Sequence, residues 1–115
     1  MHWDGEQSRD FTFVSDVARA NLMAGAAGPQ VDGQVFNIGA GRAKTVNETL
    51  AAISEVLGVW IEPVRTPKRQ GDVRSTLADI SRARELLGWE PQAEWHDAVA
   101  ATVRWFTEGT RPAAK

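Results

Sequence analysis

The feature that most constrains this chain is a segment, residues 17–26, whose helical pattern is apolar almost all the way round. Only Arg19 and Asn21 interrupt the apolar surface, so the helix needs cover on more than one side. A chain of 115 residues buries about two thirds of its unfolded surface, which is enough for one core. The sequence therefore predicts one packed unit in which this helix lies against more than one neighbour.

Short β-prone runs alternate with helical patterns along the rest of the chain. The expected strands are residues 11–14, 34–38 and 59–64, the last on a sheet edge because Pro63 donates no ladder hydrogen bond. The expected helices are residues 17–26, 46–57, 80–87 and 95–106. Ser15 or Asp16 can cap the first helix, and Thr45 with Glu48 has capping-box spacing before the second. This order indicates a mixed α/β unit with few strands for its helices.

Composition excludes several classes of function. With 13 Lys and Arg against 15 Asp and Glu, the net charge of −2 gives no electrostatic reason to expect nucleic acid or an anionic membrane as a partner. The chain has no cysteine, which excludes disulfides and thiolate metal sites and suits a cytoplasmic protein. It also has no tyrosine, so no phenol can act here as an acid or a base.

A turn of small residues, Gly39-Ala40-Gly41, lies between the second predicted strand and the second predicted helix. Backbone N–H groups at such a turn can bind a phosphate, but Lys44 stands where a dinucleotide fingerprint has its third glycine. We therefore favour a plain strand-to-helix turn over a nucleotide site. His2 and His96 are isolated in the sequence, and no metal site is expected.

Two arginines from separate segments are the most suggestive pair of charged residues. Arg9 precedes the first predicted strand, and Arg69 lies in a basic loop that contains glycine and proline. Two guanidinium groups that converge can bind a diphosphate through bidentate contacts. From spacing alone, solvated surface arginines are the alternative, so the residues by themselves indicate an α/β unit with a candidate anion site.

Five motifs that occur in order give the chain a family resemblance. They are residues 9–18 (RDFTFVSDVA), 35–41 (VFNIGAG), 69–72 (RQGD), 78–83 (ADISRA) and 86–91 (LLGWEP). The series resembles the C-terminal third of the extended short-chain dehydrogenases/reductases, that is, the NAD-dependent nucleotide-sugar epimerases and 4,6-dehydratases of the UDP-glucose 4-epimerase type. The resemblance covers the chain from about Asp4 to Phe106.

The resemblance implies a substrate-binding portion without the catalytic machinery. The family's Gly-rich NAD-binding loop and Tyr-x-x-x-Lys pair do not occur in this sequence, so no catalytic residue and no cofactor are expected on this chain alone, although full-length relatives use NAD. The family pattern puts Arg9, Asn37 and Arg69 near the diphosphate of a UDP- or dTDP-sugar. It puts Asp72 where a carboxylate can accept from the ribose hydroxyls, and Thr76 near the sugar pocket.

The same resemblance implies the fold class, an α/β C-terminal fragment of a Rossmann-type enzyme with one terminal sheet strand, residues 34–38, and the small substrate-binding lobe. Residues 1–108 would then form a single α/β substrate-binding unit, and residues 109–115 a disordered tail. The open strand edge and the uncovered helix face would seek a partner, and a two-fold homodimer covers both.

Two functions follow from these observations. The first is the nucleotide-sugar-binding portion of an NAD-dependent epimerase or dehydratase. The alternative is a non-catalytic structural or interaction module that has lost ligand binding. The intact set of Arg9, Asn37, Arg69 and Asp72 favours the first, because a purely structural module has no chemical reason to keep it.

Overall fold

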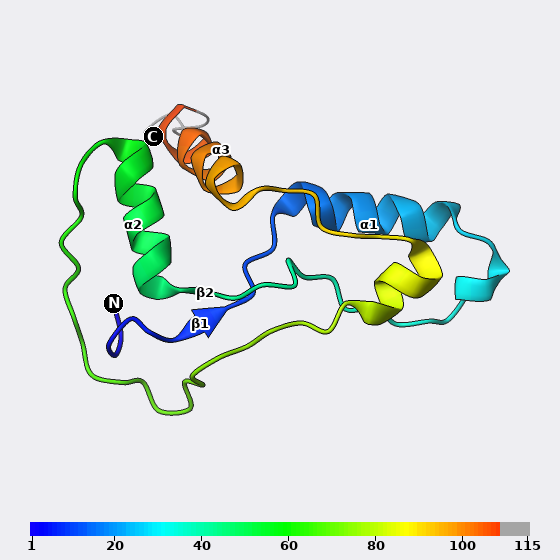
Figure 1. Cartoon of the computed structure of the whole chain (residues 1–115), viewed down its shortest axis with the longest axis horizontal. Helices are drawn as coiled ribbons and strands as arrows, with labels where there is room; N and C mark the ends of the chain where they lie inside the picture. Colours follow the sequence, from blue (N-terminus) through cyan, green and yellow to red (C-terminus); the bar gives the residue numbers. More distant parts are fainter. Residues whose placement is uncertain (109–115) are drawn as a thin grey trace, which may run out of the picture.

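The chain is elongated and open, in a computed structural model that describes residues 1–108; the predicted tail at 109–115 lies outside the described residues. In chain order the elements are β1 (Ser8–Arg9), α1 (Val14–Ala26), the 3-10 helix η1 (Pro29–Val31), β2 (Lys44–Thr45), α2 (Val46–Leu57), the π-helix η2 (Ala83–Leu87) and α3 (Trp95–Glu108). Figure 1 shows α1 and η2 at one end and α2 and α3 towards the other. The accessible surface of 8137 Å² exceeds the roughly 6,200 Å² expected of a compact protein of this mass.

A strand of only two residues, β1, joins three parts of the chain. On one edge β1 pairs antiparallel with β2, so that Ser8 lies opposite Thr45 and Arg9 opposite Lys44. On the other edge the Ser8 N–H donates to the Arg74 carbonyl at 2.9 Å, and the Ser8 carbonyl accepts from the Thr76 N–H at 3.1 Å. The junction therefore places the loop before Arg74 beside Arg9, although the two are far apart in the sequence.

The core lies at the α1 end and forms around Trp89. Its buried members are Ala20, Ile80, Ala83 and Trp89. The predicted helix at 80–87 is partly wrong, because its last five residues form the π-helix η2. In this wider turn the Ala83 carbonyl accepts from the N–H groups of both Gly88 and Trp89. Gly88, at φ 63°, then turns Trp89 into the core, where the indole N–H donates to the Asp16 carbonyl at 3.1 Å.

The predicted strand at 34–38 is extended but unpaired. Phe36 and Ile38 pack against the core, whereas Val35, which directly precedes Phe36, is 75% exposed. Within residues 1–108 the backbone of 35–38 makes no main-chain hydrogen bond, and the sheet consists of β1 and β2 alone. The side-chain alternation of a strand is thus present, and its edge is open among the residues described, as predicted for a terminal strand apart from its sheet.

The other two predicted strands are wrong. Residues 11–13 are extended without a partner, and Val14 already starts α1. Residues 59–64 form no strand. The main chain of this segment pairs with the first residues of the chain only after Pro63. There the Thr66 N–H donates to the Met1 carbonyl, and the Thr66 carbonyl accepts from the Trp3 N–H, both at 2.9 Å.

The helix α2 begins and ends as its sequence predicts. The Glu48 N–H donates to Thr45 Oγ1 at 3.0 Å, and the Thr45 N–H donates to Glu48 Oε2 at 2.7 Å, which completes the capping box. Gly58 ends the helix with φ 68°. α2 packs against α3, whose Val99 is buried while Phe106 remains exposed. None of the helices described is long and apolar enough to cross a membrane.

The helix α1 carries two different faces. Val14 and Leu22, one above the other at helical spacing, are 72% and 75% exposed. The opposite face holds Ala20 in the core and the buried Asp16. The described chain thus covers α1 on one side only, whereas its apolar character calls for cover on more than one.

Asp16 does not cap α1, and neither does Ser15, because both lie inside the first turn behind the N-cap Phe13. The Asp16 carboxylate instead accepts from the Gln92 and Ala93 N–H groups, each at 3.0 Å, and from Arg19 Nη2 at 2.9 Å. Burial alone would raise the pKa of Asp16, but these hydrogen bonds together outweigh it and hold the pKa below its usual value.

We expect Asp16→Asn to lower the free energy of unfolding at pH 7 by about 1–3 kcal/mol, because an amide cannot serve the same donors. Since the folded-state pKa of Asp16 is depressed, its contribution is complete above about pH 4 and is lost as the pH falls through the folded value. Urea unfolding at pH 7 and pH 3 measures both effects, with the exposed Asp32→Asn as the control. Equal losses in the two variants at pH 7 would contradict this role of Asp16.

Candidate functional site

A cavity of about 510 Å³ lies where β1 faces the loop that carries Arg69 and Asp72. Residues from three segments line it, among them Gln7, Arg9, Val46, Arg69, Gln70 and Asp72. The cavity therefore exists because the β1 junction gathers these segments, and not because of any continuous stretch of sequence.

A tight turn presents the charged side chains of the loop. The Asp72 N–H donates to the Arg69 carbonyl at 3.1 Å, and Gly71 has φ +83°. A positive φ at the third position of a four-residue turn favours glycine, which explains the sequence Arg69-Gln70-Gly71-Asp72. The turn sets Arg69 and Asp72 at its two ends, and both line the cavity.

An aromatic side chain holds the loop on both sides of this turn. The centre of a Trp3 ring lies 3.9 Å from Lys68 Nζ and 4.7 Å from Arg74 Cζ. Arg74 also forms an ion pair with Asp4 at 2.7 Å, and its hydrogen bonds lower the pKa of that carboxyl. Each cation–π contact at an exposed site contributes about 0.5–1 kcal/mol, so together they help to order a loop whose own residues are mostly exposed.

Two arginines and one carboxylate set the charge of the cavity. Arg9 Nη2 donates to Asp72 Oδ1, and Arg9 Nη1 donates to the Ser8 carbonyl at 2.7 Å. A guanidinium group has five N–H donors, so Arg9 keeps donors for a further acceptor. Arg69 forms no ion pair with the residues described. The excess positive charge suits an anion that offers more than one acceptor group.

The structure brings together three of the five predicted site residues, namely Arg9, Arg69 and Asp72. Asn37 lies outside the cavity lining, and its Nδ2 donates to the Asp79 carbonyl at 3.2 Å. Thr76 is exposed beside the junction, where its N–H donates to the Ser8 carbonyl. The roles predicted for all five stay predictions.

Sequence reasoning missed two residues that line the cavity, Gln7 and His2. Nothing in the sequence indicated either residue, because both precede the predicted strand at 11–14 and lie outside the quoted motifs. His2 Nδ1 lies 2.8 Å from Thr66 Oγ1, in a pairing that joins the two ends of a long stretch of chain.

The Gly39-Ala40-Gly41 turn already has its amides bonded. Asp10 accepts from the Ala40 N–H at 2.6 Å and from the Gly41 N–H at 3.1 Å. The same carboxylate accepts from the Ala78 N–H at 3.2 Å. A Cβ placed on Gly39 would lie 2.6 Å from the Ala78 Cβ and from Asp10 Oδ2. The turn is therefore a packing and bonding site for Asp10 and offers no free pair of N–H groups to a phosphate.

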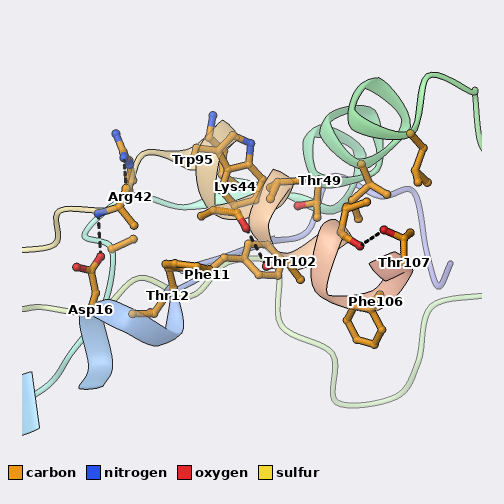
Figure 2. Close-up of a pocket in the computed structure, with 18 residues that line it drawn as sticks. Phe11, Thr12, Asp16, Arg42, Lys44, Thr49, Trp95, Thr102, Phe106 and Thr107 are labelled. Carbon is orange, nitrogen blue, oxygen red and sulfur yellow. Dashed lines mark hydrogen bonds between the residues drawn. The ribbon is translucent and has the colours of Figure 1, made fainter. Parts of the chain in front are cut away.

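A second cavity, of about 420 Å³, lies between α2, α3 and the start of α1 (Figure 2). Its walls are mostly apolar, and the Phe11 and Trp95 rings lie 5.8 Å apart within them. The cations on its rim, Arg42 and Lys44, pair with Glu94 and Glu48. The first cavity is therefore the candidate site for a charged ligand.

A family model decides what kind of protein carries this cavity. The model of the GDP-mannose 4,6 dehydratase family matches residues 3–102, which is most of the chain. The chain belongs to this family.

Several relatives match this chain along nearly all of its length. The UDP-glucose 4-epimerase of Mycolicibacterium smegmatis is 43% identical over 103 residues, which cover 90% of this chain and 32% of the relative. The structure of a UDP-glucose 4-epimerase from Thermotoga maritima with UDP-glucose has a TM-score of 0.85 and 44% identity, and the match covers 94% of this chain and 34% of that one. MoeE5 in complex with UDP-glucuronic acid and NAD has a TM-score of 0.86 and 35% identity over 96% of this chain and 36% of its own.

The chain thus spans about a third of the length of the relatives it matches. The matches confirm the predicted family, the extended short-chain dehydrogenases/reductases, and the fold class, an α/β part of a Rossmann-type enzyme. Relatives such as MoeE5 have been solved with NAD. The glycine turn of this chain offers NAD no free amides, because Asp10 accepts from the Ala40 and Gly41 N–H groups, and we assign no residue here to the cofactor.

We expect Gly39→Ala to lower the free energy of unfolding by about 1–3 kcal/mol, because the added methyl group must displace Ala78 or Asp10. The matched control is Gly25→Ala in α1, where a Cβ meets nothing within 4 Å. That control should raise the free energy of unfolding by about 0.4–1 kcal/mol. Chemical denaturation followed by circular dichroism compares them, and a Gly39→Ala variant as stable as the wild type would show that the turn is less tightly packed.

Proposed function

We propose that this chain supplies the nucleotide-sugar-binding portion of an NAD-dependent epimerase or dehydratase, with a UDP- or dTDP-sugar as its ligand. The observation that carries the proposal is the convergence of Arg9 and Arg69 on one cavity from distant segments. Relatives solved with UDP-glucose and UDP-glucuronic acid support this ligand class. The proposal places the protein in the cytoplasm, which a chain without cysteine suits.

The proposal gives each site residue a task. Arg9 and Arg69 bind the oxygens of the diphosphate, and Asp72 accepts from the ribose hydroxyls. Asn37 contributes to the diphosphate side of the ligand and Thr76 to its sugar side, although neither residue lines the cavity. Hydride transfer is left to a part with a Tyr-Lys pair, because this chain contains no tyrosine.

A ligand held by one part of a divided site makes only some of its contacts, and it still loses its motional freedom on binding. The expected dissociation constant is therefore about 1 mM, or about 4 kcal/mol of binding free energy.

The alternative is a structural or interaction module that has lost ligand binding. One observation favours it, namely that Arg9 and Asp72 bond to each other across the cavity. This ion pair gives both residues a structural task that needs no ligand. The two readings differ in whether the chain binds a nucleotide diphosphate at all.

We expect a chain with Arg9→Ala and Arg69→Ala to bind UDP-glucose at least tenfold more weakly than the wild type, because hydrogen bonds to charged groups contribute about 1.5–3 kcal/mol each. NMR titration of the ¹⁵N-labelled chain at millimolar ligand measures this loss, with dTDP-glucose as a second ligand. Arg104→Ala on the exposed side of α3 is the control and should bind as the wild type does.

If the double variant does not fold, Arg69→Ala alone tests the site. Arg69 is exposed and makes no ion pair with residues 1–108, so its replacement leaves the fold intact. A folded wild-type chain that binds neither nucleotide sugar would support the structural alternative.

We also propose that the chain forms a homodimer through its α1 end. The exposed stripe of α1 and the unpaired segment 34–38 lie at the same end of the molecule (Figure 1). A two-fold axis lets one copy of segment 34–38 pair with the other, which satisfies both open edges at once.

We expect the chain to elute as a dimer, about twice the monomer mass of 12.6 kDa, at micromolar concentration in size-exclusion chromatography with light scattering. Val35→Lys should shift it towards monomer, because Val35 is 75% exposed in the single chain and its replacement costs little there. Val64→Lys, at 81% exposure and away from α1, is the matched control. A monomer in all three samples would overturn the dimer and leave the α1 end to a different protein partner.

A further inference from the structure

We propose that Gln7 contacts the ligand, and that its carboxamide oxygen accepts a hydrogen bond from a donor group on the nucleoside, next to the diphosphate held by Arg9 and Arg69. This inference rests on the proposed function and adds a residue that distinguishes a nucleotide from other diphosphates.

The first observation is a buried acceptor without a donor. Gln7 is 5% exposed and lines the cavity, and its Oε1 finds no hydrogen-bond partner among residues 1–108. Buried side-chain oxygens almost always have a donor, because water is no longer available to them. A buried acceptor without a donor, on a residue that lines a cavity, is therefore suited to a donor that arrives with a ligand.

The second observation is that the orientation of this amide is fixed. Gln7 Nε2 donates to the His2 carbonyl at 2.9 Å. A flipped amide would set Oε1 against that carbonyl, oxygen against oxygen, so the bond to His2 assigns the two ends of the side chain. The backbone is held as well, because the Gln7 carbonyl accepts from the Val46 N–H at 3.1 Å. Oε1 is thus pre-positioned as an acceptor.

The cavity offers a ligand two kinds of partner, namely the donors of the arginines and the acceptor of Gln7. Ionised diphosphate oxygens only accept hydrogen bonds, so they match the arginines and cannot satisfy Gln7. Ribose hydroxyls and base N–H groups can donate to it. Gln7 directly precedes β1 and stands two residues before Arg9, and both residues line the cavity. Two residues of extended backbone span roughly 7 Å. This is the scale that separates a nucleoside from its diphosphate.

The experiment compares UDP with inorganic pyrophosphate, which carries the charge but no nucleoside donor. In NMR titrations we expect Gln7→Met to weaken UDP binding at least fivefold and to change pyrophosphate binding less than twofold. Arg69→Ala, the matched comparison, should weaken both ligands. The ratio of the two affinities corrects for any general loss of folding, since that loss would affect both ligands alike.

Three analogues identify the donor: 2′-deoxy-UDP, 3′-deoxy-UDP and N3-methyl-UDP. The analogue without the donor that Gln7 meets should bind the wild type and Gln7→Met equally well. If Gln7→Met does not fold, the side-chain amide signals of wild-type Gln7 give the second measurement, and they should shift with UDP but not with pyrophosphate.

The outcomes separate this inference from the proposed function. A wild type that binds neither UDP nor pyrophosphate overturns both. A wild type that binds UDP, with Gln7→Met unchanged or equally weakened for both ligands, overturns the role of Gln7 alone. The same holds if the loss in Gln7→Met persists for all three analogues, or if the amide signals of Gln7 do not respond to UDP.

Discussion

Two carboxylates near the start of the chain hold together segments that no sheet connects. Asp10 accepts from the N–H groups of Ala40, Gly41 and Ala78, and Asp16 accepts from those of Gln92 and Ala93. In a closed α/β unit a sheet ladder would satisfy many such groups, but here the ladder has two residues on each strand. Hydrogen bonds to an ionised acceptor are roughly twice as strong as neutral ones, so a few of them can take over this task. The α1 end keeps its place relative to β1 largely through these two side chains.

The dependence on single carboxylates explains why the molecule is open. The segment 34–38 is held by Phe36 and Ile38 against the core on one side, while its backbone edge stays unpaired within the described chain. Trp89 is fully buried in the core, and it directly follows the π-helix η2 and its C-cap Gly88. Packing therefore fixes the shape of this end, whereas main-chain pairing, which normally closes a sheet, is missing.

Local sequence signals predicted those features that depend on neighbours in sequence. The Thr45–Glu48 capping box and the bounds of the helix at 46–57 are each decided within a few residues, and both are present. Strand formation depends on a partner, which the sequence of one strand cannot provide, so the predicted strands at 11–14 and 59–64 failed and the segment 34–38 is extended but unpaired. The ordered motifs predicted the family because they carry information about a whole enzyme. The motifs predicted only part of the candidate site. They did not indicate Gln7, because its position depends on a hydrogen bond to the His2 carbonyl that no motif encodes.

The molecule thus presents two kinds of incomplete surface, and they differ in what would complete them. The apolar stripe of α1 and the open edge at 34–38 need further protein, because only backbone and apolar side chains can satisfy them. The cavity beside β1 is supported from within the chain, by the junction at Ser8 and by the contacts of Trp3 with Lys68 and Arg74. In the proposed function, the anion and the donor group of a ligand complete it. Since the two surfaces are linked mainly through Asp10 and β1, cover for the α1 end and a ligand for the cavity act on different parts of the molecule. In the proposed function, such a separation lets the binding portion keep its own geometry while another part performs the chemistry.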